Sequence, residues 1–361
     1  MKKTRNKEQK METMKKMTPY LSDKLKALSF MSIIMVVFIH TFYTEGSNYQ
    51  VLSFIESLIG GSMARIAVPL FYFISGYLLF LHMDSLVSCL GKIKKRMRTL
   101  LVPYLIANTL SFCFYLSFDL LARIVPGMGG VMNFHVMEWF DDGWGEVISK
   151  IYWEPIAFQL WFVRDMLIFI WLLPIIQFLL RWISKTKASA LLGILVLLFL
   201  QVYSELLVLW MAIGGLISLG RVYDLTKVCT NCWIALGSSL IFLALIVAHA
   251  FGNDEKVCEA MISMVGIVAV WYVYDMLLKG KMICQTPKGK AITSYTFFIY
   301  LTHIPLLLIF KKLPLMLSQS EWMLTCCYLL VPFIYCAFAI LLGAFLKKKI
   351  PSFYYLYAGG R

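Results

Sequence analysis

One histidine near the end of the first apolar stretch is the residue that could most readily do chemistry in this chain. His40 lies close to the far end of residues 25–44, which are predominantly apolar. An ionisable side chain in hydrocarbon is strongly disfavoured unless it faces protein, water or a ligand. A neutral imidazole can take a proton from a hydroxyl group near pH 7. His40 is therefore the first candidate for a catalytic residue.

Further polar side chains lie near the ends of later apolar stretches, at a depth similar to that of His40 if each stretch is a helix rising ~1.5 Å per residue. They are Arg65, Trp161, Arg164, Asp165, Tyr300 and His303. Charged residues embedded in a membrane tend to be paired and functional. We therefore predict that these side chains form one polar chamber in the outer half of a helical bundle.

Each of these residues also has an interpretation without a catalytic role. His40 could simply bond to a neighbouring helix, and His303, in the sequence His-Ile-Pro, could only cap or kink its helix. Arg65 and Arg164 could be anchors at the membrane interface. Arg164 and Asp165 are not expected to pair, because adjacent helical residues point apart.

The composition indicates which elements must position these residues. The chain has 361 residues, of which 60% are hydrophobic and 15% charged, with a mean hydropathy of +0.75. Apolar runs of roughly 17–25 residues can cross a ~30 Å hydrocarbon core as helices, and the alternation of a membrane β-barrel is missing. We predict an all-α, polytopic membrane protein with about ten transmembrane helices. The predicted helices cover residues 25–44, 64–82, 100–122, 159–181, 188–203, 206–220, 232–251, 260–278, 291–310 and 323–346.

The net charge is +14, and the distribution of the basic residues along the chain indicates the membrane topology. Lysine and arginine gather in alternate gaps between the apolar runs, as the positive-inside rule requires, so both termini are predicted to be cytoplasmic. This distribution argues against a nucleic-acid partner and for contact with anionic membrane lipids. We expect a basic, retained cytoplasmic arm at 1–24, a membrane domain at 25–346 and a cytoplasmic tail at 347–361.

Three local patterns carry smaller predictions. Pro103 is expected in the first turn of the third span, where its missing amide proton is tolerated. Ser75 and Gly76 indicate a close helix contact. Cys229 and Cys232 form a single C-x-x-C pattern, which is a weak zinc signal without a second pair, and no metal is expected.

Five segments resemble the acyltransferase type 3 family. They are LKALSFMSIIMVVFIHT, VPLFYFISGYLLF, KKRMRTLLVPYL, QLWFVRDMLIFIWLLPII and SYTFFIYLTHIPLL, and together they cover the chain from end to end. The resemblance implies a ten-span enzyme that moves an acyl group, commonly acetyl, from a cytoplasmic thioester donor to a surface glycan. One position departs from the family pattern, because Ser29 stands where a basic residue is expected. Lys26 is a hypothetical replacement, and a divergent or inactive relative is the alternative.

With this resemblance, each candidate residue has an expected role. Acyl transfer to a hydroxyl needs a base and groups that stabilise the oxyanion, and coenzyme A is an anion that basic clusters attract. The field that attracts it would come from Lys24, Lys26 and the cluster Lys92 to Arg98. The candidates are, for catalysis, His40, Arg164 and Asp165; for the acceptor, Arg65, Trp161, Tyr300 and His303; and for acetyl-CoA, Lys26, Lys95, Arg96 and Arg98.

The expected activity is therefore O-acetylation of a surface glycan or lipid-linked saccharide by a multi-pass protein of the bacterial plasma membrane. Two other functions compete with it. A transporter or flippase could also line a pathway with buried charges, although no related halves are evident. A non-catalytic member of the same family is the second alternative, and Ser29 is the residue that favours it.

Overall fold

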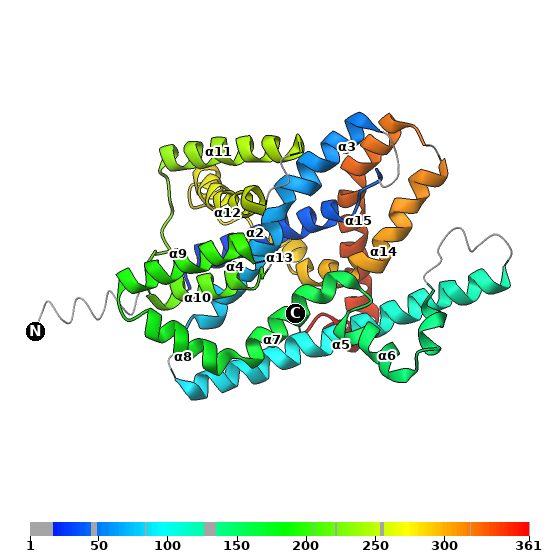
Figure 1. Ribbon diagram of the computed structural model, residues 1–361, viewed down its shortest axis with the longest axis horizontal. Helices are drawn as coiled ribbons and strands as arrows, with labels where there is room; N and C mark the ends of the chain where they lie inside the picture. The colour runs from blue at the N-terminus through cyan, green and yellow to red at the C-terminus, as the bar shows by residue number, and fades with distance from the viewer. Residues whose placement is uncertain are drawn as a thin grey trace, which may run out of the picture.

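The structure is a computed structural model, and it describes residues 17–44, 49–83, 85–125, 135–204, 206–220, 222–252, 256–317 and 319–360. In these ranges every regular element is a helix, which confirms the all-α class (Figure 1). The first half contains α2 (Pro19–Ile39), α3 (Gln50–Glu56), η1 (Ser57–Ser62), η2 (Met63–Ile66), α4 (Ala67–Phe80), α5 (Leu86–Ile124), η4 (Val136–Phe140), α6 (Trp144–Ile148), η5 (Ser149–Trp153), η6 (Phe158–Leu160), α7 (Trp161–Trp171) and α8 (Leu173–Ile183). The second half contains α9 (Lys187–Tyr203), α10 (Leu209–Gly220), α11 (Cys232–Ala250), α12 (Lys256–Leu278), α13 (Pro287–Thr293), α14 (Thr296–Leu317), α15 (Glu321–Lys349) and α16 (Pro351–Tyr357).

The helices include several that can cross a membrane. Six of those in the described ranges are long and apolar enough, or seven if the bent pair of η6–α7 and α8 counts as one span. The helices α2, α9 and α10 stand outside this group; α9 and α10 are short, and the first half of α2 carries three charges. The chain is thus a multi-pass membrane protein, while ten spans and two cytoplasmic termini stay predictions.

The first helix begins earlier than predicted. The side chain of Thr18 accepts a hydrogen bond of 3.1 Å from the amide of Leu21, and Pro19 occupies the first turn, as it does at many helix starts. Lys24 therefore belongs to α2 and not to its flank. Residues 1–16 of the predicted cytoplasmic arm lie outside the described residues.

The helix α5 also differs from its prediction. Ser85 and Ser88 form a reciprocal capping box at its start, and the basic segment 92–98 is part of the helix. Pro103 lies in the helix interior, so the prediction that it occupies a first turn was wrong. The basic side chains consequently sit on a rigid rod, which runs along one edge of the molecule (Figure 1).

The predicted fourth span is not straight. The helices α7 and α8 meet at an angle of 72°, and Pro174 lies at the start of α8. Proline lacks an amide proton, and its ring clashes with the carbonyl four residues earlier, so the helix breaks just before it. The segment WLLPII contains this signal, which the prediction of one continuous span at 159–181 overlooked.

The helices α4 and α10 pack together through glycines on both sides. A Cβ atom added at Gly76 would lie 2.1 Å from the carbonyl oxygen of Met211, and one added at Gly214 would lie 2.3 Å from that of Phe73. Only residues without a side chain allow two backbones to approach so closely. The predicted close contact at Gly76 is thus confirmed.

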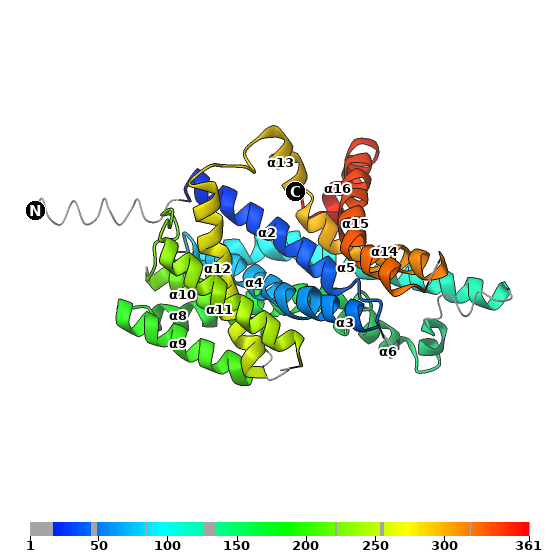
Figure 2. The same cartoon turned by 90° about the horizontal axis from the view of Figure 1, so that it is seen from above.

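The end of the chain is packed and helical. After α15, α16 buries Tyr354 and Tyr357, and Gly359 lies against the backbone of Thr99 in α5 with a φ of +66°, a conformation that suits glycine. The helices α13 and α16 lie on the same side of the molecule (Figure 2). The C-terminal residues therefore support the basic part of α5.

Candidate functional site

Two of the predicted site histidines are in contact. The ring of His40, at the end of α2, stacks on the ring of His303 in α14, with centroids 5.3 Å apart and planes inclined by 23°. Phe158 meets the His40 ring edge-on at 4.9 Å. His40 is half-buried, and neither of its ring nitrogens forms a hydrogen bond within the described part of the chain. Its nitrogens are therefore available to a substrate.

The backbone around His303 fixes its ring. His303 is fully buried, and its Nδ1 lies 2.7 Å from the carbonyl oxygen of Tyr300. Because a carbonyl oxygen only accepts, Nδ1 must carry the proton in this contact and Nε2 is left as an acceptor. Nε2 is buried and has no hydrogen-bond partner in the described part of the chain. The structure thus presents an unused proton acceptor beside His40.

A break in α14 and a glutamine hold this arrangement. Ile304 has extended angles inside the helix, as expected for a residue before proline. Its carbonyl oxygen, which has left the helical pattern, accepts a hydrogen bond of 3.1 Å from the side chain of Gln159. The hydroxyl of Tyr300 donates to the carbonyl of Gln159 over 2.7 Å. The sequence analysis missed Gln159, although an amide side chain at the start of an apolar run is a signal.

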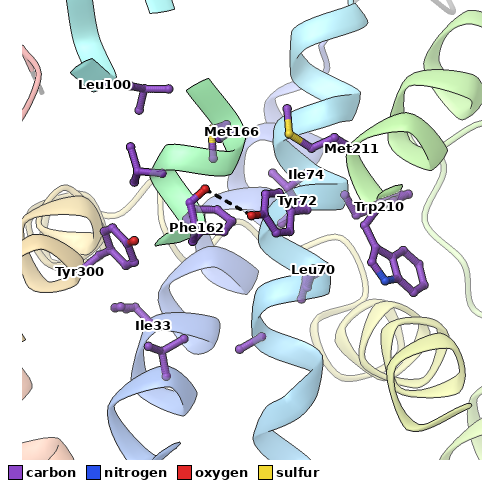
Figure 3. Close-up of a cluster of buried hydrophobic side chains, with 14 of the residues drawn as sticks. Ile33, Leu70, Tyr72, Ile74, Leu100, Phe162, Met166, Trp210, Met211 and Tyr300 are labelled. Carbon is purple, nitrogen blue, oxygen red and sulfur yellow. Dashed lines mark hydrogen bonds between the residues drawn. The ribbon is translucent and has the colours of Figure 1, made fainter. Parts of the chain in front are cut away.

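A cavity of about 330 Å³ lies beside this group. Its apolar wall includes Leu25 of α2 and four side chains that Figure 3 labels: Ile74 of α4, Leu100 of α5, Phe162 of α7 and Tyr300 of α14. The hydroxyl of Tyr72 donates to the carbonyl of Phe162 over 3.3 Å and fixes α4 against α7 (Figure 3).

The polar lining of this cavity includes two of the predicted donor ligands. Lys26 and Ser29 of α2 line it together with Arg96 of α5. Among the described residues, neither Lys26 nor Arg96 forms an ion pair with a carboxylate. Their positive charge is therefore available to an anion, and Lys26 shares the cavity with Ser29, which it is hypothesised to replace.

The other two predicted donor ligands lie elsewhere. Lys95 and Arg98 are exposed on α5 and do not line the cavity. On one helix, only residues that share a face can reach the same cavity, and these two flank Arg96 at one and two positions, a spacing that points them away from it.

Lys24 does not contribute to a field for an anion. Its ammonium group lies 2.8 Å from Asp275, with both side chains fully buried, and donates to the carbonyl of Trp271 over 3.0 Å. It also lies 3.8 Å from the centroid of the Trp271 ring. The expectation for Lys24 was wrong, because this charge is neutralised inside the contact between α2 and α12.

Arg164 and Asp165 form an ion pair, against the sequence-based expectation. The guanidinium Nη2 lies 3.0 Å from Asp165, and Nη1 donates to the carbonyl of Trp153 over 2.8 Å. Long side chains can bend back toward each other at the start of a helix. Within the described residues these groups show no contact with His40, so they hold the segment that leads to Phe158.

The residues predicted to form one polar chamber lie in different parts of the structure. Arg65 forms an ion pair of 3.0 Å with Glu259 of α12 and lines a different cavity. Trp161 packs at the edge of the main core against Phe162, with ring centroids 6.5 Å apart. The structure thus brings together His40, Tyr300 and His303 but not Arg65.

Comparisons with known proteins agree with the family resemblance. A family profile described as "Acyltransferase domain" matches residues 24–342. The chain is 23% identical to "Succinoglycan biosynthesis protein ExoH" of Rhizobium meliloti (strain 1021), over 94% of this chain and 93% of that protein. No solved structure matches the chain.

Proposed function

Because this chain belongs to the acyltransferase 3 family, we propose that it moves an acyl group from a cytoplasmic acyl-CoA to a hydroxyl group of an extracytoplasmic or lipid-linked polysaccharide. Acetyl-CoA is the proposed donor, and the bacterial plasma membrane is the proposed location. The relative named for succinoglycan biosynthesis supports a glycan acceptor.

The observation that carries the proposal is one cavity lined both by two cations without a carboxylate partner in the described residues and by Tyr300, the neighbour of the histidine pair. Lys26 and Arg96 line it with Tyr300, and the Tyr300 ring lies 5.8 Å from the His303 ring, which stacks on His40. The cations would bind phosphate groups of the donor, since ammonium and guanidinium groups are suited to that task. The thioester would then extend along the apolar wall toward Tyr300.

The proposed reaction uses His40 as the base. The imidazole takes the proton of the acceptor hydroxyl, and the oxygen attacks the thioester carbonyl carbon. The carbon–sulfur bond then breaks, and the thiolate of coenzyme A leaves and receives the proton. His303 would keep the His40 ring in place through the stacked contact, and Arg164 with Asp165 would position the segment that carries Phe158. No metal enters this mechanism.

Purified, full-length protein in lipid nanodiscs tests the donor site. Lys26→Ala or Arg96→Ala should weaken acetyl-CoA binding about tenfold each, since a charge-assisted hydrogen bond contributes about 1.5–3 kcal/mol. Lys348→Ala, which removes an exposed lysine away from the cavity, is the matched control. If both cavity variants bind acetyl-CoA like the unmodified protein, the donor does not use this cavity.

A further inference from the structure

A second cavity, of about 620 Å³, lies at the C-terminal end of α2, where Ile39 and Phe42 line it. Its polar lining comes from four places in the chain: Arg65 of η2, Gln201 of α9, Ser204 beyond α9, and Lys256, Glu259 and Ser263 of α12. Ligand cavities in proteins commonly measure about 300–1,000 Å³. The volume therefore suits a small molecule or one unit of a larger one.

The charged pair in this cavity is held by further contacts. Arg65 donates through Nε to the carbonyl of Gly61 and through Nη1 to Glu259. The other carboxylate oxygen of Glu259 lies 3.7 Å from Nε2 of the buried His249, whose Nδ1 lies 2.9 Å from the hydroxyl of Ser62. These contacts fix the carboxylate and the guanidinium before any ligand arrives.

Two buried polar atoms in the same cavity lining have no hydrogen-bond partner among the residues that the structure describes. Gln201 is 7% exposed; its amide nitrogen donates to the carbonyl of Ser204 over 3.3 Å, while its Oε1 is unpaired. The hydroxyl oxygen of Ser204 is also buried, and no described residue bonds to it. An unsatisfied buried group costs about 1–3 kcal/mol. A ligand that bonds to both atoms would remove this cost.

The types of these groups indicate the chemistry of the ligand. Gln201 Oε1 and the Glu259 carboxylate only accept hydrogen bonds, the Arg65 guanidinium and the Lys256 ammonium group only donate, and the Ser204 hydroxyl does both. Sugar hydroxyls both donate and accept, so they can bond to all of these groups. A phosphate dianion only accepts, so it would leave Gln201 Oε1 unpaired and would lie near the like charge of the Glu259 carboxylate.

We propose that this cavity binds one sugar unit of the acceptor saccharide, an inference that rests on the proposed function. Ile39 and Phe42 line the cavity and flank His40 in sequence. The same end of α2 therefore carries the proposed base and forms one wall of the saccharide site. A polysaccharide held here would have one sugar unit at the helix end that carries His40.

The binding experiment uses full-length protein in lipid nanodiscs and an oligosaccharide prepared by partial hydrolysis and de-esterification of the source cell's surface polysaccharide. Gln201→Leu should weaken binding of this oligosaccharide about tenfold, and Ser204→Ala less, as measured by calorimetry. Ser238→Ala is the matched control, because the Ser238 hydroxyl bonds within α11 to the carbonyl of Ile234 over 2.6 Å. Unchanged affinity in Gln201→Leu, or no binding to the unmodified protein, would overturn the proposal.

Two further measurements separate the possible failures. Gln201→Leu should bind acetyl-CoA like the unmodified protein, which shows that the variant is folded. If the unmodified protein binds acetyl-CoA but not the oligosaccharide, the saccharide site is contradicted and the donor site still stands, whereas absence of acetyl-CoA binding in the unmodified protein contradicts the proposed function. Displacement of the oligosaccharide by glycerol phosphate would identify a lipid headgroup as the occupant and overturn the inference.

Discussion

The imidazole rings of His40 and His303 are stacked, and Nδ1 of His303 is tied to the carbonyl of Tyr300. This contact joins the end of α2 to the break in α14. The His40 ring is therefore oriented by His303, whose own ring is fixed by a hydrogen bond to the backbone of α14. A preorganised site requires such support.

Replacing His303 tests this positioning role. His303→Phe keeps an aromatic ring against His40 but loses the bond to Tyr300, so the turnover number should fall about tenfold to a hundredfold, with little change in the KM for acetyl-CoA. Steady-state release of free coenzyme A measures both constants. Equal values for variant and unmodified protein would show that the stack has no part in turnover.

We expect the ion pair between Lys24 and Asp275 to stabilise the folded protein. Lys24→Met leaves the Asp275 carboxylate buried without its cation, which typically costs about 3–5 kcal/mol. The midpoint of thermal aggregation in detergent should fall strongly. The double variant Lys24→Met with Asp275→Leu removes both charges and should recover most of the loss; a double variant as unstable as the single one contradicts the pairing argument.

The glycine contact between α4 and α10 allows a matched pair of substitutions. Gly76→Ala places a methyl group against the backbone of Met211 and should cost about 1–3 kcal/mol. Gly237→Ala in α11 meets nothing within 4 Å, and should raise stability by roughly 0.5–1 kcal/mol because alanine favours helix. Thermal midpoints that move in the same direction would refute the packing explanation.

Arg164 is expected to act through the segment before α7. Arg164→Ala removes the bond to the carbonyl of Trp153 as well as the ion pair with Asp165. Amide hydrogen exchange of residues 153–158 should become faster, and turnover should fall because Phe158 contacts His40. Arg164→Gln, which keeps one donor, should give intermediate exchange. Unchanged exchange in both variants would assign Arg164 a different role.

Helical class and the main site contact were predictable from the sequence. Hydropathy indicates the helices, and counting residues from the helix ends placed His40 and His303 at similar depth, where the structure puts them in contact. Lys26 and Arg96 were predicted to share a donor site, and they line one cavity. Their roles stay predictions.

Other features depend on how helices rotate about their axes, which hydropathy does not report. A depth argument cannot tell that Arg65 faces Glu259 of α12 while His40 faces α14. For the same reason the partner of Lys24 was unforeseen, since Asp275 reads as one more polar residue near a helix end. The bend between α7 and α8, by contrast, was readable from Pro174.

The most direct test of the proposed acyl transfer is His40→Ala in the native cell, with ester-linked acyl groups on the surface polysaccharide quantified by chemical release. Loss of a general base typically slows a reaction about 10²–10⁴-fold, so the ester content should fall to that of a strain without the protein, at an unchanged protein level. Normal ester content at a normal protein level would contradict the proposed acyltransferase activity. It would favour a transporter or a non-catalytic member of the family instead.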